Sequence, residues 1–225
     1  IMKMLYKYMS APVDFENSCI KLLVIEDKRL FRKTILSVYH NDEDELFVFS
    51  ENYKPMYFSK NIRFIDDILT FEFADKKLMT KVNASFENMC NVNFFNEINN
   101  LRECCNSICE SLAKEYDFDF DFCNNIETSA FLKLFAFTPR NDSENSAERL
   151  VRYLKLLKNY LGIKCFLLQN LHLYLNDEEI EMILSSAVAH NICIVDIENS
   201  VPAKISKSES LIVIDKDLCE IVDKN

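Results

Sequence analysis

The sequence predicts an α/β protein whose parallel-rich sheet is flanked by helices and which carries an inserted α-helical subdomain. Two observations predict this fold class: short apolar runs alternate with amphipathic segments toward both ends of the chain, and helical periodicity alone fills its middle. The segments that separate successive apolar runs are long enough for parallel strand pairing. With 225 residues, of which 49% are hydrophobic, the chain can bury a sizeable core.

Residues 1–60 are predicted to form the first part of a head domain. An apolar strand at Ile20–Ile25 ends in two acidic residues, and the following KRLFRKTILSVYH has its apolar residues at helical spacing. A second short strand is expected at Leu46–Phe49. Strand, tight turn and amphipathic helix in this order open an α/β unit.

Residues 61–138 are predicted to form an α-helical leg domain. From about Asp75 onward, apolar residues recur every three or four positions, which indicates two long helices interrupted near Asn91. The leg is therefore an insertion between two parts of the head.

Residues 139–225 are predicted to complete the head domain. Helices and strands alternate again, at Ala147–Leu161, Lys164–Leu168, Asp177–His190, Ile192–Val195 and Leu211–Ile214. Asn176 and Glu179 stand at the N-cap and N3 positions of the second helix, an arrangement that predicts a capping box.

The sequence excludes nucleotide hydrolysis at a Walker-type site. The apolar run Cys165–Leu168 resembles a Walker-B strand, but it ends in Gln169 and Asn170 where such a strand carries carboxylates. The chain has a single glycine, Gly162, whereas phosphate-binding loops need at least two. Gly162 instead follows a helix, where a left-handed residue is wanted.

Composition limits the remaining classes of function. The formal net charge of −10 repels nucleic acid as a whole, so DNA binding would need local basic clusters or bound cations. Nine cysteines without a CxxC pair favour reduced, mostly buried thiols in the cytoplasm over disulfides or a zinc site. No segment approaches the roughly 18 apolar residues of a membrane helix, and IMKMLYKYMS has no signal-peptide run.

The stretch KEYDFDFDF alternates acidic with aromatic residues. In an extended chain, four carboxylates would share one face, those of Glu115, Asp117, Asp119 and Asp121. Same-face neighbours lie about 6 to 7 Å apart, so they could bind calcium only with a bend or with further ligands. A half-buried strand with a solvated acidic face is the other interpretation. An EF-hand is excluded because Phe122 and Thr128 stand where glycine and glutamate are needed.

A second candidate site resembles that of a metal-dependent nuclease. Asp14 and the Glu26-Asp27-Lys28 sequence at a strand end could place an acid and an E-x-K trio around magnesium. Lys28 also begins a basic helix face, and such a face is more typical of a solvated surface. The basic residues singled out for contact with DNA phosphates are Lys28, Arg29, Arg32, Lys33, Lys54 and Lys60.

Four stretches, in order and spacing, resemble the small CRISPR-associated Csn2 family of type II-A systems. These stretches are VIEDKRLFRKTILSVY, IDDILTFEF, EYDFDFDF and LIVIDKDLCEI. The resemblance covers essentially the whole chain and is closest to the short branch of this spacer-acquisition family.

The resemblance implies a degenerate P-loop-ATPase-like head without nucleotide chemistry and a helical leg inserted in it. It further implies a homotetrameric ring that binds structural Ca²⁺ and holds double-stranded DNA ends in its hole. The integrase and the effector nuclease of the same system are the implied protein partners. By this resemblance Glu115, Asp117, Asp119 and Asp121 are the calcium ligands, whereas the sequence after them, FCNNIETS, is longer than expected and leaves Glu127 in doubt.

Three hypotheses follow from these observations. The first is a non-enzymatic ring that binds DNA ends through phosphate contacts. The second is a metal-dependent nuclease that uses Asp14, Glu26 and Lys28. The third is a protein scaffold of the adaptation complex that does not bind DNA, which the net negative charge favours.

Overall fold

The computed structural model describes residues 1–16, 19–41, 46–73, 75–115, 120–140 and 145–221. The chain divides into two compact units, one of Ile1–Phe73 with Asn141–Asn225 and one of Ala74–Arg140. We call the first unit the head and the second the leg, and describe each by itself. The described part of the chain is an α/β protein with a mixed, largely parallel main sheet, as the sequence predicts.

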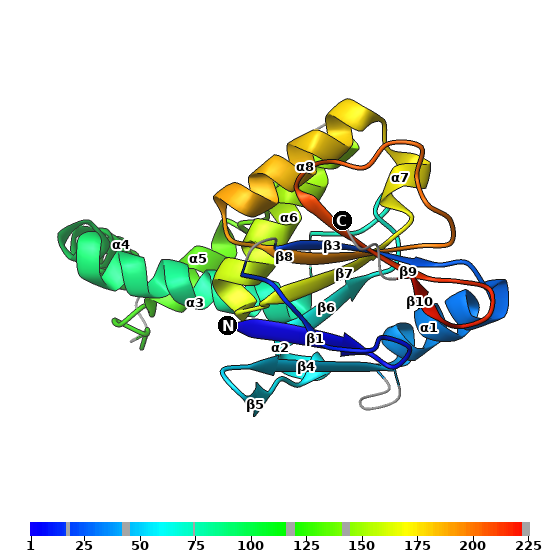
Figure 1. Cartoon of the computed structure of the whole chain (residues 1–225). Helices are drawn as coiled ribbons and strands as arrows, with labels where there is room; N and C mark the ends of the chain where they lie inside the picture. Colours follow the sequence, from blue (N-terminus) through cyan, green and yellow to red (C-terminus); the bar gives the residue numbers. More distant parts are fainter. Residues whose placement is uncertain (17–18, 42–45, 74, 116–119, 141–144, 222–225) are drawn as a thin grey trace. The chain divides into compact units, whose positions relative to one another are not determined.

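The head is built on a six-stranded sheet, shown in Figure 1. Its strands, in spatial order, are β10 (Glu220–Ile221), β9 (Glu209–Ile214), β3 (Ile20–Ile25), β8 (Cys193–Glu198), β7 (Cys165–Gln169) and β6 (Ile62–Ile65). All neighbours pair in parallel except β9 and β10. Every residue of β3 is buried, because both faces of the sheet are covered; this explains why all its residues except Lys21 are apolar.

β6 lies within residues 61–138, which the sequence assigned to the leg. It pairs in parallel with β7, from Ile62 opposite Cys165 to Ile65 opposite Leu168. The contacts therefore place it in the head.

A small antiparallel sheet covers one face of the main sheet. Its strands, in spatial order, are β2 (Val13–Asp14), β1 (Met2–Tyr6), β4 (Phe47–Glu51) and β5 (Lys54–Pro55). With helix α1 (Lys28–His40), its inner side chains and those of β3, β7, β8 and β9 form one apolar core. β1, β2 and β5 were not predicted from the sequence, since their runs are short and their alternation is brief.

Three helices lie on the opposite side of the main sheet in Figure 1: α6 (Ser146–Leu161), α7 (Leu171–Tyr174) and α8 (Asp177–Ala189). The predicted capping box of α8 is confirmed, because Asn176 accepts from the Glu179 backbone and Glu179 accepts from that of Asn176. Gly162 ends α6 with φ of 70°, the left-handed conformation expected from its position. The short helix α2 (Phe58–Asn61) precedes β6.

The leg contains helices α3 (Lys76–Asn93), α4 (Phe95–Lys114) and α5 (Thr128–Leu134). A network of hydrogen bonds joins them: Arg102 of α4 donates to the Ile126 carbonyl at 2.8 Å and to the Thr128 hydroxyl at 3.1 Å. The Thr128 hydroxyl in turn donates to Asn91 of α3 at 2.8 Å. The interruption predicted near Asn91 falls at Phe94, between α3 and α4.

Most of the cysteine side chains are at least partly accessible. The expectation of mostly buried thiols is wrong: of the nine cysteines, all unpaired, only Cys165 is fully buried. Several of the others lie on leg helices that the small leg core does not cover. None of the helices in the described residues has the length and apolarity needed to cross a membrane.

We expect Tyr6→Phe to lower the free energy of unfolding by about 0.5 to 1.5 kcal/mol, the typical net value of a buried hydrogen bond. The Tyr6 hydroxyl lies 2.7 Å from that of Thr34, and this buried contact ties the small sheet to α1. Urea denaturation measures the change, with Tyr8→Phe as the control because the Tyr8 side chain is only half-buried. Equal effects of the two substitutions would contradict the role of this bond.

Candidate functional site

The basic side chains predicted on α1 share its outer face. Lys28, Arg29, Arg32 and Lys33 are all exposed, whereas Leu30, Thr34, Ser37 and Val38 of the same helix are buried. The helix begins at an N-cap, Asp27, whose carboxylate accepts from the Leu30 backbone at 2.7 Å. The structure thus brings four cations together on one exposed helix face.

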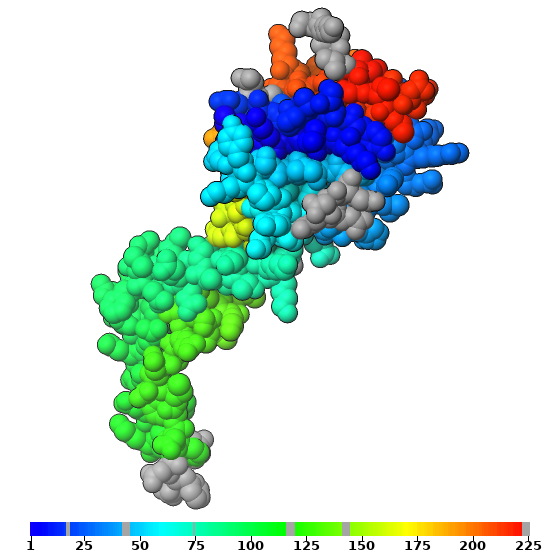
Figure 2. Space-filling view, turned by 60° about the horizontal axis from the view of Figure 1, so that its bottom comes forward, coloured from blue at the N-terminus to red at the C-terminus, as the bar shows by residue number. Residues whose placement is uncertain are grey.

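The other predicted basic residues, Lys54 and Lys60, belong to the small-sheet side of the head. Both are exposed, and the Lys60 ammonium lies 5.7 Å from the centre of the Tyr57 ring. Tyr53, which is 96% exposed, lies close to the Lys3 ammonium in the same way, at 6.0 Å. In Figure 2 the N-terminal strand, in dark blue, and the segment near residue 55, in cyan, form one continuous surface of the head.

These two basic regions are separate. α1 and β5 lie at opposite ends of the small-sheet layer in Figure 1. The structure therefore groups Lys28, Arg29, Arg32 and Lys33 but does not bring Lys54 and Lys60 to them.

The structure does not assemble the three residues of the nuclease hypothesis. Asp14 lies on β2 opposite Lys3, and its charge acts on Lys21 near the start of β3. Glu26 follows the last residue of β3 and donates its backbone N–H to Ile214 at 2.9 Å. Five residues of extended strand, from Lys21 to Glu26, span about 16 Å, which is too far for Asp14 and Glu26 to bind one ion.

Of the acidic residues predicted to bind calcium, Glu115 and Asp121 lie within the described parts of the leg, and Asp117 and Asp119 lie outside them. Glu115 follows the last residue of α4, and both carboxylates are exposed. Residues 120–127 form neither helix nor strand. Phe120 and Phe122 line a hollow of about 250 Å³ with three residues of α4, so the aromatic side of the pattern faces that helix.

A further cluster of titratable side chains lies in the head, on the face of the main sheet that α6, α7 and α8 cover. Asp196 and Glu198 alternate on β8, opposite Leu22 and Val24 of β3. Glu209 begins β9 opposite Ile20, which also pairs with Ile194. Because paired residues of parallel strands point to the same face, all three carboxylates share it.

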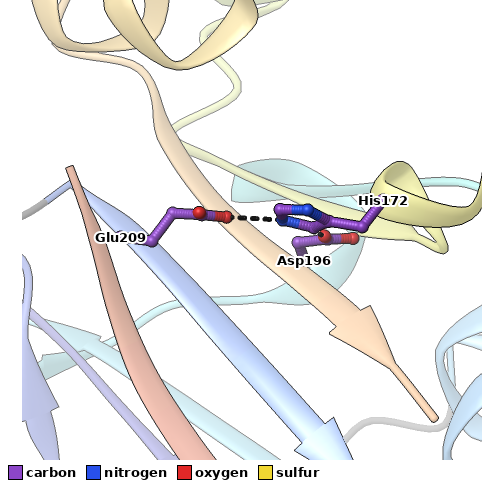
Figure 3. A group of neighbouring side chains, drawn as sticks. All are labelled: His172, Asp196 and Glu209. Atoms are coloured by element: carbon purple, nitrogen blue, oxygen red, sulfur yellow. Dashed lines mark hydrogen bonds and ion pairs between the residues drawn. The ribbon is translucent and has the colours of Figure 1, made fainter. Parts of the chain in front are cut away.

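His172 of α7 completes this cluster, as Figure 3 shows. Its Nε2 lies 2.9 Å from the Glu209 carboxylate and 3.9 Å from Oδ2 of Asp196. Its backbone N–H donates to Glu198 at 2.8 Å. The side chains of Asp196 and Glu209 are fully buried, and that of His172 is 10% exposed. His172 and Glu198 also line a cleft of about 470 Å³.

Burial governs the protonation of these acids. Loss of hydration raises the pKa of Asp196 well above its usual range, and the charge of Glu198 raises it further. Burial also raises the pKa of Glu198, while its hydrogen bond from the His172 backbone works in the opposite direction. Oδ2 of Asp196 has no hydrogen-bond partner among the described residues.

Sequence reasoning missed this cluster. The strand expected at Ile192–Val195 stops one residue before Asp196, whereas β8 continues to Glu198. The alternation of I-V-D-I-E was the available signal, because Ile197 continues the apolar pattern beyond the first acid. The apolar sequence neighbours of His172 gave no sign of a site; of the two, Leu171 is buried and Leu173 is exposed.

We expect Asp196→Asn to raise the free energy of unfolding at pH 7 by about 1 to 3 kcal/mol in the presence of a chelator, since it replaces a buried carboxyl whose Oδ2 has no hydrogen-bond partner among the described residues. Because the pKa of Asp196 is raised in the folded wild-type protein, protonation of this group favours the folded state. The stability that it contributes is fully present below the unfolded pKa, about 3.9, and is lost as the pH rises through the folded pKa. The advantage of the variant should therefore shrink as the pH falls toward 4. Denaturation at several pH values measures this, with the exposed Asp217→Asn as the control. A constant difference between Asp196→Asn and the wild-type chain across that range would contradict the expectation.

The comparisons with known proteins agree with the resemblance seen in the sequence. The family described as CRISPR-associated protein (Cas_Csn2) matches residues 38–218, which is most of the chain and includes β4, the whole leg and β9. No curated protein matches the chain. The extent of the family match shows that the chain belongs to the CRISPR-associated Csn2 family.

Proposed function

We propose that the protein is a non-enzymatic ring that binds the ends of double-stranded DNA during spacer acquisition in a type II-A CRISPR system. The observation that carries this proposal is the family match over residues 38–218. The ring is a homotetramer stabilised by calcium, and it acts with the integrase and the effector nuclease of its system.

The exposed face of α1 supports a DNA-binding role. Four basic side chains on one helix face can contact phosphates without reading bases, which suits a protein that accepts ends of any sequence. In a chain with a net charge of −10, such local clusters are where DNA is attracted.

The start of α1 supports a degenerate ATPase-like head. The turn between β3 and α1 is where a parallel α/β nucleotide-binding fold places its phosphate loop. Here that turn is Glu26-Asp27, and the Asp27 carboxylate caps the helix end that would otherwise meet a phosphate. In this head β7 keeps the packing role of a Walker-B strand without its carboxylates, since it ends at Gln169.

The leg supports assembly into a ring. It exposes many large apolar side chains, each at least 39% accessible: Met89, Val92, Phe94, Phe95, Ile108, Leu112, Phe120, Phe122, Leu134, Phe135 and Phe137. Exposure of so many apolar side chains on a unit of this size is typical of a surface that contacts another protein. Copies of the same chain are the partner that the family resemblance implies.

The types of residue near Glu115 in the sequence would suit a calcium ion. Carboxylate and carbonyl oxygens are the ligands that calcium prefers, and the C-terminal end of α4 supplies free carbonyl groups with partial negative charge. Glu115 and Asp121 would hold the ion together with Asp117 and Asp119. The bound charge would offset the repulsion between these acids.

We expect linear duplex DNA to bind in calcium and a closed circle of equal length to bind much less, because an end must thread a ring. In a gel-shift assay across salt concentrations, Lys28→Glu with Arg32→Glu should lower the slope of log K against log salt by about 2 if both contact phosphates. Lys207→Glu with Lys216→Glu, two exposed lysines outside α1, is the charge-matched control. Equal binding of linear and circular DNA would contradict the threading geometry. Equal losses of DNA affinity in the test and control variants would contradict the α1 site.

We expect Glu115→Gln with Asp121→Asn to weaken calcium binding at least about 10-fold, because each loses a charged oxygen ligand. Sedimentation velocity with and without calcium should show that the variant no longer forms the calcium-dependent assembly. Glu103→Gln with Glu110→Gln removes the same charge from exposed positions of α4 and serves as the control. If the control pair behaves like the test pair, general charge and not ligation controls assembly.

A further inference from the structure

In the described part of the chain, the ion pairs of Asp196 and Glu209 are with His172 and not with a lysine or arginine. Burial of an ionised carboxylate is costly unless it is paired or binds a metal, and Asp196 and Glu209 are both fully buried there. Lys21, the buried lysine of β3, pairs with Val195 and Ser210 and so points to the opposite face. Lys204, at the cleft, is exposed and binds Asp177 at 2.9 Å.

The ligand atoms of the cluster already converge. One nitrogen of His172 and one oxygen from each acid all lie within 4.8 Å of one another. Metal ligands at bond lengths of about 2.0 to 2.2 Å stand roughly 3 to 3.5 Å apart around one ion. The separations of 2.9 and 3.9 Å from Nε2 to the two acids bracket that spacing, so small rotations complete it.

The unpartnered Oδ2 of Asp196 points to a ligand independently of this convergence. It is the oxygen that faces His172, and it accepts no hydrogen bond from any described residue. The other oxygens are already held: Oδ1 accepts from the Leu171 backbone at 3.4 Å, and the second Glu209 oxygen accepts from the Ser206 backbone at 2.8 Å. Such contacts orient metal ligands. They leave Oδ2 of Asp196 free for an ion, whereas the Glu209 oxygen that now bonds Nε2 of His172 would exchange this bond for the ion.

We propose that His172, Asp196 and Glu209 bind one divalent cation that accepts mixed nitrogen and oxygen ligands, such as Mn²⁺ or Zn²⁺. An imidazole nitrogen with two carboxylates favours such ions over Ca²⁺ or Mg²⁺, which take oxygen ligands. Water from the 470 Å³ cleft beside His172 fills the remaining positions. The ion fastens α7, β8 and β9 to one another, and its site is separate from the acids of the leg.

The test is thermal unfolding and calorimetric titration of the full chain after chelator treatment. Mn²⁺ is the primary probe, because Zn²⁺ would also bind some of the nine unpaired cysteines. At about 100 times its Kd, Mn²⁺ should raise the Tm of the wild-type chain by about 5 °C or more. In the Glu115→Gln, Asp121→Asn variant, Ca²⁺ and Mg²⁺ at the same concentration should raise the Tm clearly less than Mn²⁺ does.

Three near-isosteric variants test the ligands: His172→Gln, Asp196→Asn and Glu209→Gln. Each should weaken Mn²⁺ binding at least about 10-fold, whereas His190→Gln, at the exposed end of α8, should bind as wild type does. Circular dichroism of the chelated proteins shows whether each variant is folded, and three separate positions keep the test valid if one is not.

Two results would overturn the proposal. If the three variants bind Mn²⁺ as the wild-type chain does, the ion is held elsewhere. If no ion shifts the wild-type Tm and Asp196→Asn is more stable in every buffer, the buried carboxyl holds a proton and not a metal.

Discussion

The register of β3 with its two parallel neighbours is the constraint on which the rest of the head depends. β3 is buried along its whole length, so both faces of the sheet must be covered, one by the small sheet with α1 and the other by α6 and α8. A shift of one residue would turn every side chain of β8 to the opposite face. The same pairing that fills the core therefore also places Asp196 and Glu198 under α7 and aligns Glu209 with them.

The two faces of the sheet have different chemistry. The face toward the small sheet is almost entirely apolar, with Leu23, Ile25, Val195 and Ile197 among its members. The other face also buries apolar side chains, among them Ile20, Phe166 and Ile194, but it carries three carboxylates beside Leu22 and Val24. Buried carboxylates add little to the stability of a core. Their presence on the second face, and not on the first, indicates that the second face has a role in binding as well as in stability.

Local patterns predicted the strands and helices that bury long apolar stretches, and the predicted strand Ile20–Ile25 coincides with β3. Cap residues such as Asn176 were predictable because a cap is a property of neighbours in sequence. The small sheet was not, since β1 and β4 pair across more than forty residues and each is only 5 residues long. The cluster around His172 was not either, because it joins three elements through tertiary contacts.

The Asp27 cap of α1 has a consequence for any anion that approaches this helix end. The carboxylate is delivered by the chain itself, one residue before the helix, so its effective concentration at the amide groups does not fall when the protein is diluted. A free phosphate would have to displace this tethered group while remaining bimolecular, and it would do so beside the further negative charge of Glu26. The Asp27 carboxylate therefore competes with anions for the end of α1 at every protein concentration, because it cannot diffuse away.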